Sequence, residues 1–363
     1  MIKLHKSVQR IRYPPFEHSN MNAAEVPLVE VVLESQHPPP PSFKIGTDDD
    51  WMVEWRRCKD DDPEWPVIQS DISTDPFPFL MRTRDGWYIE PDPLHTLARR
   101  LISPTVSLLI FTLLIHSMEP GLVKIGLLSE AIAGSYRIGP LDYPKMLLVA
   151  FPIFLLPIVS RMVANLRDIR RQNAYIESPL EPPVISLVNE RNGVRIDKMR
   201  MPLEIMASRA RIQVGIAVPE RSKVLEALTR KEGGQPAPGM STQLPERRIT
   251  TGEELGTGVG EAIPMPVAHQ RVLLLEPMRV QEVGEWVDIR GSEVGHRLKG
   301  PENLWPGSIY SAVIAIHWEL VIQAIRDDGT RMKWVRPLKM PSREGLEEIS
   351  KMVVRSGRIE LSN

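Results

Sequence analysis

Two long apolar stretches in the middle of the chain restrict its fold more than any other feature. The first, Leu101–Met118, contains 18 residues without a charged side chain, close to the lower limit of about 17 residues for a helix that crosses a bilayer. The second, Met146–Ser160, is shorter, but Lys145 and Arg161 at its ends can extend their charged groups toward water and so lengthen the span. The predicted transmembrane helices cover residues 99–118 and 143–166.

Basic residues gather at those ends of the two predicted helices that face away from their connection. They are Arg99, Arg100, Arg161, Arg167, Arg170 and Arg171. The segment from Glu119 to Lys145, which joins the two helices, carries three basic and three acidic residues. Because positively charged flanks stay on the cytosolic side, these arginines predict a multi-pass protein of the cell membrane with both termini in the cytosol. The alternative is a buried helical pair inside a soluble domain, since a core helix has the same apolar pattern.

The connection between the predicted helices, residues 119–142, is more apolar than an ordinary exposed loop. Its apolar residues recur at helical spacing, which favours an amphipathic helix on the outer membrane interface. A re-entrant segment that lines a pore is the alternative. Ionisable groups at membrane depth point to function by default. The candidates for a functional role here are His116, Glu119 and Glu130.

Charge is distributed unevenly along the chain. Residues 1–100 carry 12 Lys and Arg against 17 Asp and Glu, residues 101–160 carry three of each, and residues 161–363 carry 30 against 26. Offsets of this size do not indicate nucleic-acid binding, which requires a clustered basic face. The single cysteine, Cys58, excludes an internal disulfide and any site built from several cysteines. The amino terminus lacks the apolar core of a secretory signal peptide, so we expect residues 1–98 to lie in the cytosol.

Both flanks of the predicted helices have the pattern of β-rich regions. Residues 1–98 are rich in proline, with a PPPP run from Pro38, and contain strand-like runs. Two of these runs, FLMRT and WYIEP, are joined by Arg-Asp-Gly and predict a hairpin. Residues 167–232 predict a basic linker, a hairpin through Asn192-Gly193, a strand and then a helix from Pro219. Residues 233–268 have the Gly- and Pro-rich composition of a flexible insertion.

The last part of the chain, residues 269–363, predicts a sheet with a final hairpin that turns at Asp328-Gly329. An amphipathic helix from Pro341 to about Arg355 is expected to close this sheet. A sheet closed by a C-terminal helix and attached to a two-span hairpin is similar in layout to the pleckstrin-homology-like domains of some bacterial membrane proteins. The similarity rests on element order and includes no specific motif.

No residue pattern specifies a reaction or a ligand. The eight histidines form none of the spacings typical of metal sites. The acidic runs Asp48–Asp50 and Asp60–Asp62 do not fit a calcium-binding loop, so we interpret them as solvated turns. Cys58 lies among basic residues that can lower its pKa, but it has no identifiable base partner. We interpret His317 and Glu319 as pointing to opposite faces of one strand, with structural roles. We therefore predict no catalytic residue, no cofactor and no metal.

These features predict an α+β membrane protein in which a two-helix transmembrane hairpin carries β-rich cytosolic N- and C-terminal parts. Because a catalytic set is missing, we expect a non-catalytic scaffold or adaptor. Its expected partners are the lipid bilayer and either another protein or a second copy of itself, but not nucleic acid. Exposed tryptophans and the proline run are the expected contact sites. A subunit of a homo-oligomeric channel or transport complex is the alternative, and a membrane-bound enzyme is the third hypothesis.

Overall fold

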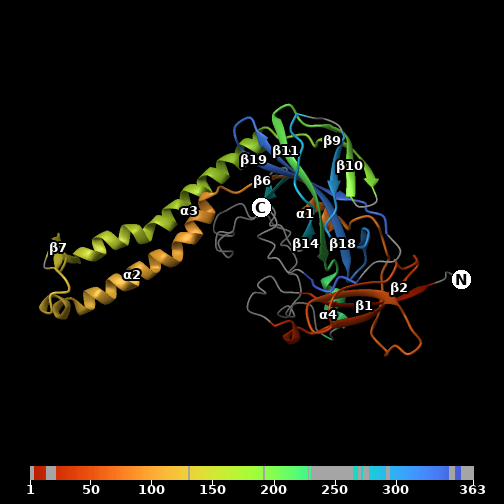
Figure 1. Ribbon diagram of the computed structural model, residues 1–363, viewed down its shortest axis with the longest axis horizontal. Coiled ribbons are helices and arrows are strands. Elements are labelled where there is room, and N and C mark those ends of the chain that lie inside the picture. The colour runs from red at the N-terminus through yellow and green to blue at the C-terminus, as the bar shows by residue number, and fades with distance from the viewer. Residues whose placement is uncertain are drawn as a thin grey trace. The chain divides into compact units, whose positions relative to one another are not determined.

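Strands from both ends of the chain belong to one unit, and the two apolar helices from its middle belong to another, in a computed structural model (Figure 1). The first unit, here called the β unit, comprises Met1–Glu90, Tyr175–Thr250 and Ile263–Asn363. The second, the helical unit, comprises Pro91–Ala174 and Thr251–Ala262. The structure describes residues 4–13, 22–129, 131–190, 193–227, 229, 265–268, 271–272, 278–291, 295–342 and 348–352.

The first strands of the chain form a five-stranded sheet with the order β3-β4-β1-β2-β5. Its members are β1 (His5–Arg12), β2 (Val29–Ser35), β3 (Phe43–Gly46), β4 (Met52–Arg57) and β5 (Val67–Gln69), and a short 3-10 helix (Ala23–Glu25) precedes β2. Alternate residues of β2 are buried, beginning with Val29, and the residues between them are half-buried. This period of two gives the sheet one face toward the core and one toward solvent.

A nine-stranded sheet follows the order β13-β12-β6-β19-β18-β11-β14, with β15 paired to β11 and β17 paired to β18. Its members are β6 (Gly86–Ile89), β11 (Ile205–Ala217), β12 (Met265–Ala268), β13 (Arg271–Val272), β14 (Arg279–Val283), β15 (Val287–Asp288), β17 (Ile309–Tyr310), β18 (Ala315–Arg326) and β19 (Arg331–Leu338). The predicted final hairpin is confirmed: β18 and β19 are antiparallel, and Gly329 between them has a φ of 81°. Glycine adopts this left-handed conformation at no steric cost.

A three-stranded sheet, in the order β16-β10-β9, contains β9 (Val184–Glu190), β10 (Gly193–Arg200) and β16 (His296–Lys299). The hairpin predicted from Asn192-Gly193 is confirmed, because Gly193 lies opposite Glu190 in the antiparallel register. The predicted strand over residues 211–218 lies largely within the longer β11. The helix expected from Pro219 is present as α4 (Arg221–Ala227), and its predicted end falls outside the described residues.

The N-terminal and C-terminal parts share one core in the β unit. Gln9 of β1 donates a buried hydrogen bond of 3.1 Å to the Ser311 hydroxyl, and the Tyr13 hydroxyl donates one of 2.8 Å to the carbonyl of Ile216. Buried side chains from all three sheets belong to one apolar cluster. The five-stranded sheet therefore does not form a domain of its own, and the predicted N-terminal region of residues 1–98 is divided between the two units.

The predicted hairpin of FLMRT and WYIEP is wrong, because the first run is a helix. Helix α1 (Pro78–Arg84) precedes β6, which pairs with β19 and not with the residues before it. Proline is favoured in the first turn of a helix, because its missing N–H would have no intrahelical partner there. The helix buries Leu80 completely. Burial on a helical face therefore overrides the strand-like alternation of this short run.

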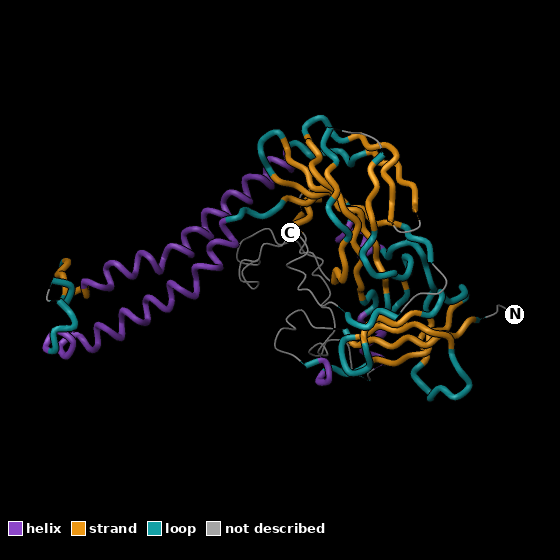
Figure 2. Tube along the Cα trace, in the orientation of Figure 1, coloured by secondary structure: helices purple, strands orange, loops and turns teal. Residues whose placement is uncertain are grey.

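The helical unit consists of α2 (Leu94–Lys124), α3 (Lys145–Glu177) and a small hairpin of β7 (Ser135–Ile138) and β8 (Leu141–Pro144) between them. Figure 2 shows these two helices in purple and the strands of the β unit in orange. Both helices are longer than the predicted spans and are long and apolar enough to cross a membrane. The fold is thus mixed α+β, with β-rich flanks around two apolar helices.

The described part of the connection between the helices does not contain the separate amphipathic helix expected within residues 119–142. Helix α2 continues through Glu119 and Pro120 to Lys124, and the following turn leads into the β7–β8 hairpin. The apolar residues expected to form a separate amphipathic helix are therefore divided between the last turn of α2 and a loop. Gly126, Gly134 and Gly139 all have positive φ values, a conformation that ends a helix and favours turns.

The predicted closing helix is absent from residues 341–342 and 348–352, the parts of it that the structure describes. Ile349 instead forms a parallel bridge with Ile45 of β3, and its N–H donates to the carbonyl of Lys44. Backbone pairing to a sheet edge satisfies the polar groups that a helix would satisfy internally. Most of the predicted flexible insertion, residues 233–268, lies outside the described residues, apart from the strand β12 at its end.

Candidate functional site

The two long helices expose most of their apolar side chains. Only 11% of the residues in the most apolar window of each helix are buried, which is unlike a core helix of a soluble domain. Phe111 is 60% exposed and Val149 is 66% exposed. Contiguous apolar surface of this kind on a protein marks a membrane or protein contact.

The residues that are buried on these helices recur every seven positions. On α2 they include Ala98, Thr105, Thr112 and Glu119, and on α3 they include Ala150, Pro157 and Ala164. A seven-residue repeat keeps one stripe facing a partner helix, and small residues in that stripe allow close approach. The Thr105 and Thr112 hydroxyls donate to carbonyls of their own helix, at 2.7 and 2.8 Å. Their polarity is thus satisfied without water.

Asp168, near the end of α3, is the centre of a polar cluster that connects α3 to the beginning of α2. It accepts hydrogen bonds from the backbone N–H of Asp92 at 3.1 Å and lies 2.9 Å from Nε2 of His95. Arg171 binds both carboxylates, at 3.1 Å from Asp168 and 3.2 Å from Asp92, and Arg167 lies 3.7 Å from Asp92. Asp92, His95 and Asp168 are buried. Two of the six arginines predicted to determine topology therefore also hold the helices together.

Replacing Asp168 with alanine is expected to loosen the base of the helical unit. The change leaves buried donors of Asp92 and His95 without an acceptor, which costs about 1–3 kcal/mol per group. We expect the amides of residues 91–98 to exchange with deuterium about tenfold faster or more. Hydrogen exchange of the full chain in detergent measures this effect. Asp142→Ala, at an exposed position of β8, is the control. Equal exchange in the two variants would contradict the role of Asp168 in holding the two helices together.

The candidates at the other end of α2 bind one another and the turn. Nδ1 of His116 lies 3.0 Å from Oε2 of Glu119, and Oε1 of Glu119 accepts the N–H of Gly134 at 2.8 Å. Glu119 is buried, whereas the His116 side chain is 38% exposed. This arrangement fastens the loop before β7 to the helix end, and it gives both residues a structural role. Glu130, the third candidate, lies outside the described residues.

A second polar cluster lies inside the β unit, on one face of the nine-stranded sheet. Arg84 at the end of α1 donates from Nε and Nη2 to the two carboxylate oxygens of Glu319 of β18, at 2.5 and 2.7 Å. Gln213 of β11 donates to Glu319 at 2.8 Å, and Nε2 of His317 lies 3.2 Å from it. The Tyr310 hydroxyl lies 2.7 Å from Nδ1 of His317. All of these side chains are buried.

This cluster corrects the interpretation of His317 and Glu319. They are two positions apart in β18, so their side chains point to the same face of the strand. Burial would raise the pKa of Glu319, but the charge of Arg84 and the bonds from Arg84 and His317 outweigh it and hold that pKa at about 2. Burial raises the pKa of Tyr310 far above its usual value. His317 and Glu319 are fully buried, and the cluster joins α1, β11 and β18 within the sheet.

Lys333 of β19 is a fully buried lysine on the same face of this sheet. Its ammonium group lies 3.2 Å from the Glu90 carboxylate. Burial lowers the pKa of Lys333 to about 8, although the charge of Glu90 acts in the opposite direction. A lysine with a lowered pKa is a recurring feature of functional sites. Here the ion pair with Glu90 explains how the lysine can be buried in the sheet.

Lys333→Met is expected to remove a rise in stability between about pH 8 and 10.5. The unfolded lysine keeps its proton to about pH 10.4, whereas the folded one releases it near pH 8. The unfolded chain therefore binds more protons in this window, so the free energy of unfolding increases with pH, by up to about 3 kcal/mol. Denaturant unfolding of both proteins across this range measures the difference. An equal rise in the variant would contradict the role of Lys333.

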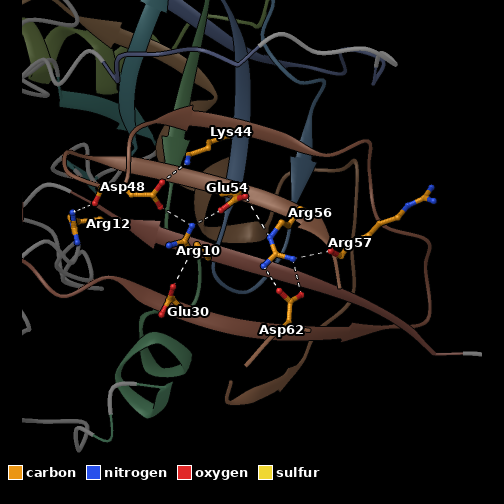
Figure 3. A network of polar contacts seen from close by, with 9 residues as sticks. All are labelled: Arg10, Arg12, Glu30, Lys44, Asp48, Glu54, Arg56, Arg57 and Asp62. Atoms are coloured by element: carbon orange, nitrogen blue, oxygen red, sulfur yellow. Dashed lines mark hydrogen bonds and ion pairs between the residues drawn. The ribbon is translucent and has the colours of Figure 1, made fainter. Parts of the chain in front are cut away.

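The solvent face of the five-stranded sheet carries a network of ion pairs (Figure 3). Arg10 of β1 lies directly between its register partners, 2.9 Å from Glu30 and 2.8 Å from Glu54, and is also 2.8 Å from Asp48. Burial would lower the pKa of Arg10, but the bonds to Glu54 and Glu30 raise it. Opposite charges directly across a sheet stabilise strand pairing. The network therefore fixes the register of β1 between β2 and β4.

The two acidic runs supply partners to this network. Asp48 binds Lys44 at 2.6 Å, in addition to Arg10. Asp62 binds Arg56 through both carboxylate oxygens, at 2.6 and 2.7 Å (Figure 3). The bond from Arg56 lowers the pKa of Asp62 to about 2. Both runs lie in turns and are largely exposed, as expected, and Asp48 and Asp62 are in addition bound by cations of the sheet.

The cysteine and the tryptophans also differ from expectation. Burial, followed by the charge of Asp62, raises the pKa of Cys58, although the charges of Arg56 and Lys6 act in the opposite direction. Six of the eight tryptophans are buried, and Trp65 and Trp286 are half-buried beneath arginine side chains. Six tryptophans are thus core residues, and none of the eight is fully exposed.

One hollow of the β unit is open to solvent and carries acidic groups. Its volume is about 660 Å³, and it is lined by Leu4, Glu34, Ser35, Gln36, Gln69, Ser70, Asp71, Phe77 and Glu220. Glu34 is paired with Lys6 at 3.0 Å. Gln36 and Asp71 are exposed. Carboxylates accept hydrogen bonds from basic side chains, and amides both accept from and donate to other amides. This acidic hollow is therefore a candidate binding site of the β unit.

Comparison with known proteins does not assign the chain to a family. No model of a protein family matches the chain, and neither a curated protein nor a solved structure matches it. Among the residues that the structure describes, no group of three or more His, Cys, Asp or Glu side chains is arranged to hold a metal ion. The candidate sites are therefore the exposed apolar helices and the acidic hollow.

Proposed function

We propose that the chain is an integral protein of the cell membrane, in which α2 and α3 form a transmembrane hairpin with both termini in the cytosol. The observation that carries this proposal is the exposure of apolar side chains along both helices. Such surface is stable in lipid, where backbone groups are satisfied within each helix. The arginines at the bases of the helices support the cytosolic placement of the termini by the positive-inside rule.

We further propose that the β unit is a non-catalytic platform that binds a protein partner. The cluster of Arg84, His317 and Glu319 in the β unit is buried, whereas the acidic hollow is open to solvent. Charge complementarity favours a partner segment rich in lysine, arginine or amide side chains. The membrane anchor would hold this partner at the cytosolic surface.

Site-specific photo-cross-linking in cells tests the platform. A photoreactive residue at Gln36, in the hollow, is expected to capture a defined protein, whereas the same residue at the exposed Asn189 of β9 is not. Replacing Asp71 with lysine should reduce the capture, because it reverses the charge that attracts a basic segment. If the purified protein is a monomer in detergent and Gln36 captures nothing, the platform proposal is wrong.

A further inference from the structure

Both connections to the helical unit leave the β unit from one end of the nine-stranded sheet, here called the linker end. Strand β6 ends at Ile89, and the N–H of Glu90 donates to the carbonyl of Arg331, where β19 begins. On the return, the carbonyl of Ser178 accepts a hydrogen bond of 3.2 Å from Arg326 at the end of β18. The N–H of Asp327 donates to the carbonyl of Glu204. The turn before β11 thus lies at the same end.

Four aliphatic side chains are exposed at the linker end and are here called the apolar rim. They are Val184 at 72%, Leu203 at 102%, Met206 at 59% and Ile325 at 38% exposure. Met206 and Ile325 are register partners in β11 and β18, and Val184 pairs with Arg200, just before the turn that contains Leu203. A fully exposed leucine in a tight turn contributes nothing to the core. A cluster of such residues on one end indicates a surface that something covers.

Helix length limits how far the linker end can lie from the bilayer. Helix α2 begins at Leu94, seven residues before the apolar stretch, and α3 continues from Leu166 to Glu177. At 1.5 Å per residue these segments are about 10 and 16 Å long. If α2 and α3 cross the membrane, the chain holds the linker end within this reach of the lipid. The bilayer interface is therefore the nearest apolar phase available to the rim.

We propose that the apolar rim inserts into the cytosolic interface of the membrane that α2 and α3 span, an inference that rests on the proposed transmembrane hairpin. Aliphatic side chains next to basic residues bind this layer, the former among the acyl chains and the latter at lipid phosphates. Arg200 and Arg331 are exposed beside the rim. The nearby Glu204 is paired with Arg326 at 2.8 Å, and Asp328 accepts the N–H of Thr330. Asp327 is exposed and remains a repulsive charge toward anionic lipid.

Depth-dependent quenching in vesicles tests this inference on the full chain. Leu203→Cys in a Cys58→Ser background is labelled with an environment-sensitive fluorophore and reconstituted in vesicles of phosphatidylcholine and phosphatidylglycerol. Leu203 is fully exposed, so its replacement does not disturb packing. Two matched cysteines serve as references: Phe111→Cys within α2, and Val67→Cys, which is 55% exposed on β5 and lies outside the rim.

We expect the probe at position 203 to shift to shorter wavelength and to be quenched by lipids spin-labelled near the headgroup, with the probe at 67 unaffected. Quenching at 111 without quenching at 203 would overturn the rim proposal and leave the hairpin intact. A wavelength shift at 203 without lipid quenching would also overturn it, because protein and not lipid would then cover the rim. Absence of quenching at both 111 and 203 would overturn the transmembrane hairpin itself.

Discussion

Removing the guanidinium of Arg84 is expected to destabilise the β unit by about 3–5 kcal/mol, because it leaves a buried carboxylate without its cation. Glu319 is completely buried, and its two oxygens receive the two short bonds from Arg84. Arg84→Met keeps much of the side-chain volume, so the effect reports the lost charge. Chemical unfolding of the full chain in detergent, followed by tryptophan fluorescence, measures the change.

A second variant separates charge from packing. In Arg84→Met combined with Glu319→Leu, both charges are absent, so most of the lost stability is expected to return. Gln213, which donates to Glu319, would still lose its acceptor, so the recovery is expected to be incomplete. If the double variant is as unstable as Arg84→Met, the interpretation of the cluster as a charge pair is wrong.

Placing an arginine at position 111 is expected to prevent α2 from crossing the membrane. Phe111 is 60% exposed and lies near the middle of the apolar stretch. A central arginine opposes insertion by about 2.5–3.5 kcal/mol, a factor of roughly 100 in the insertion equilibrium. We therefore expect Phe111→Arg to abolish the external labelling of a cysteine placed at Ser135 in the β7–β8 hairpin.

Two controls make this result specific. Phe111→Leu keeps an apolar side chain and is expected to insert normally, and Leu97→Arg introduces the same charge before the apolar stretch, where arginines already flank the helix. A helix on the surface of a soluble protein would respond in the opposite way, because a charge at an exposed position is tolerated there. Normal labelling of Phe111→Arg at position 135 would therefore contradict a transmembrane α2.

The parts of the fold that could be predicted are those determined by residues close together in the sequence. Asn-Gly and Asp-Gly turns between alternating runs gave two correct hairpins, β9–β10 and β18–β19. The apolar stretches gave the two long helices. The seven-residue spacing of Ala98, Thr105, Thr112 and Glu119 is a further local pattern, and it marks the buried side of α2.

What could not be predicted depends on contacts between distant residues. Arg84 and Glu319 are 235 positions apart, and no local pattern connects them. The polar cluster around Asp168 depends on the antiparallel return of α3, and the acidic hollow is assembled from five separate segments. The missed pair of His317 and Glu319 is different, because a period of two places such residues on one face.

The central claim is a membrane hairpin with the β unit in the cytosol, and labelling of two matched cysteines in intact cells tests it most directly. Ser135→Cys in β7 and Ser186→Cys in β9 are both at exposed positions and are examined separately in a Cys58→Ser background. We predict that a membrane-impermeant reagent labels position 135 in intact cells and labels position 186 only after the membrane is opened. Labelling of position 186 in intact cells, or release of the protein from membranes by an alkaline wash, would contradict the account.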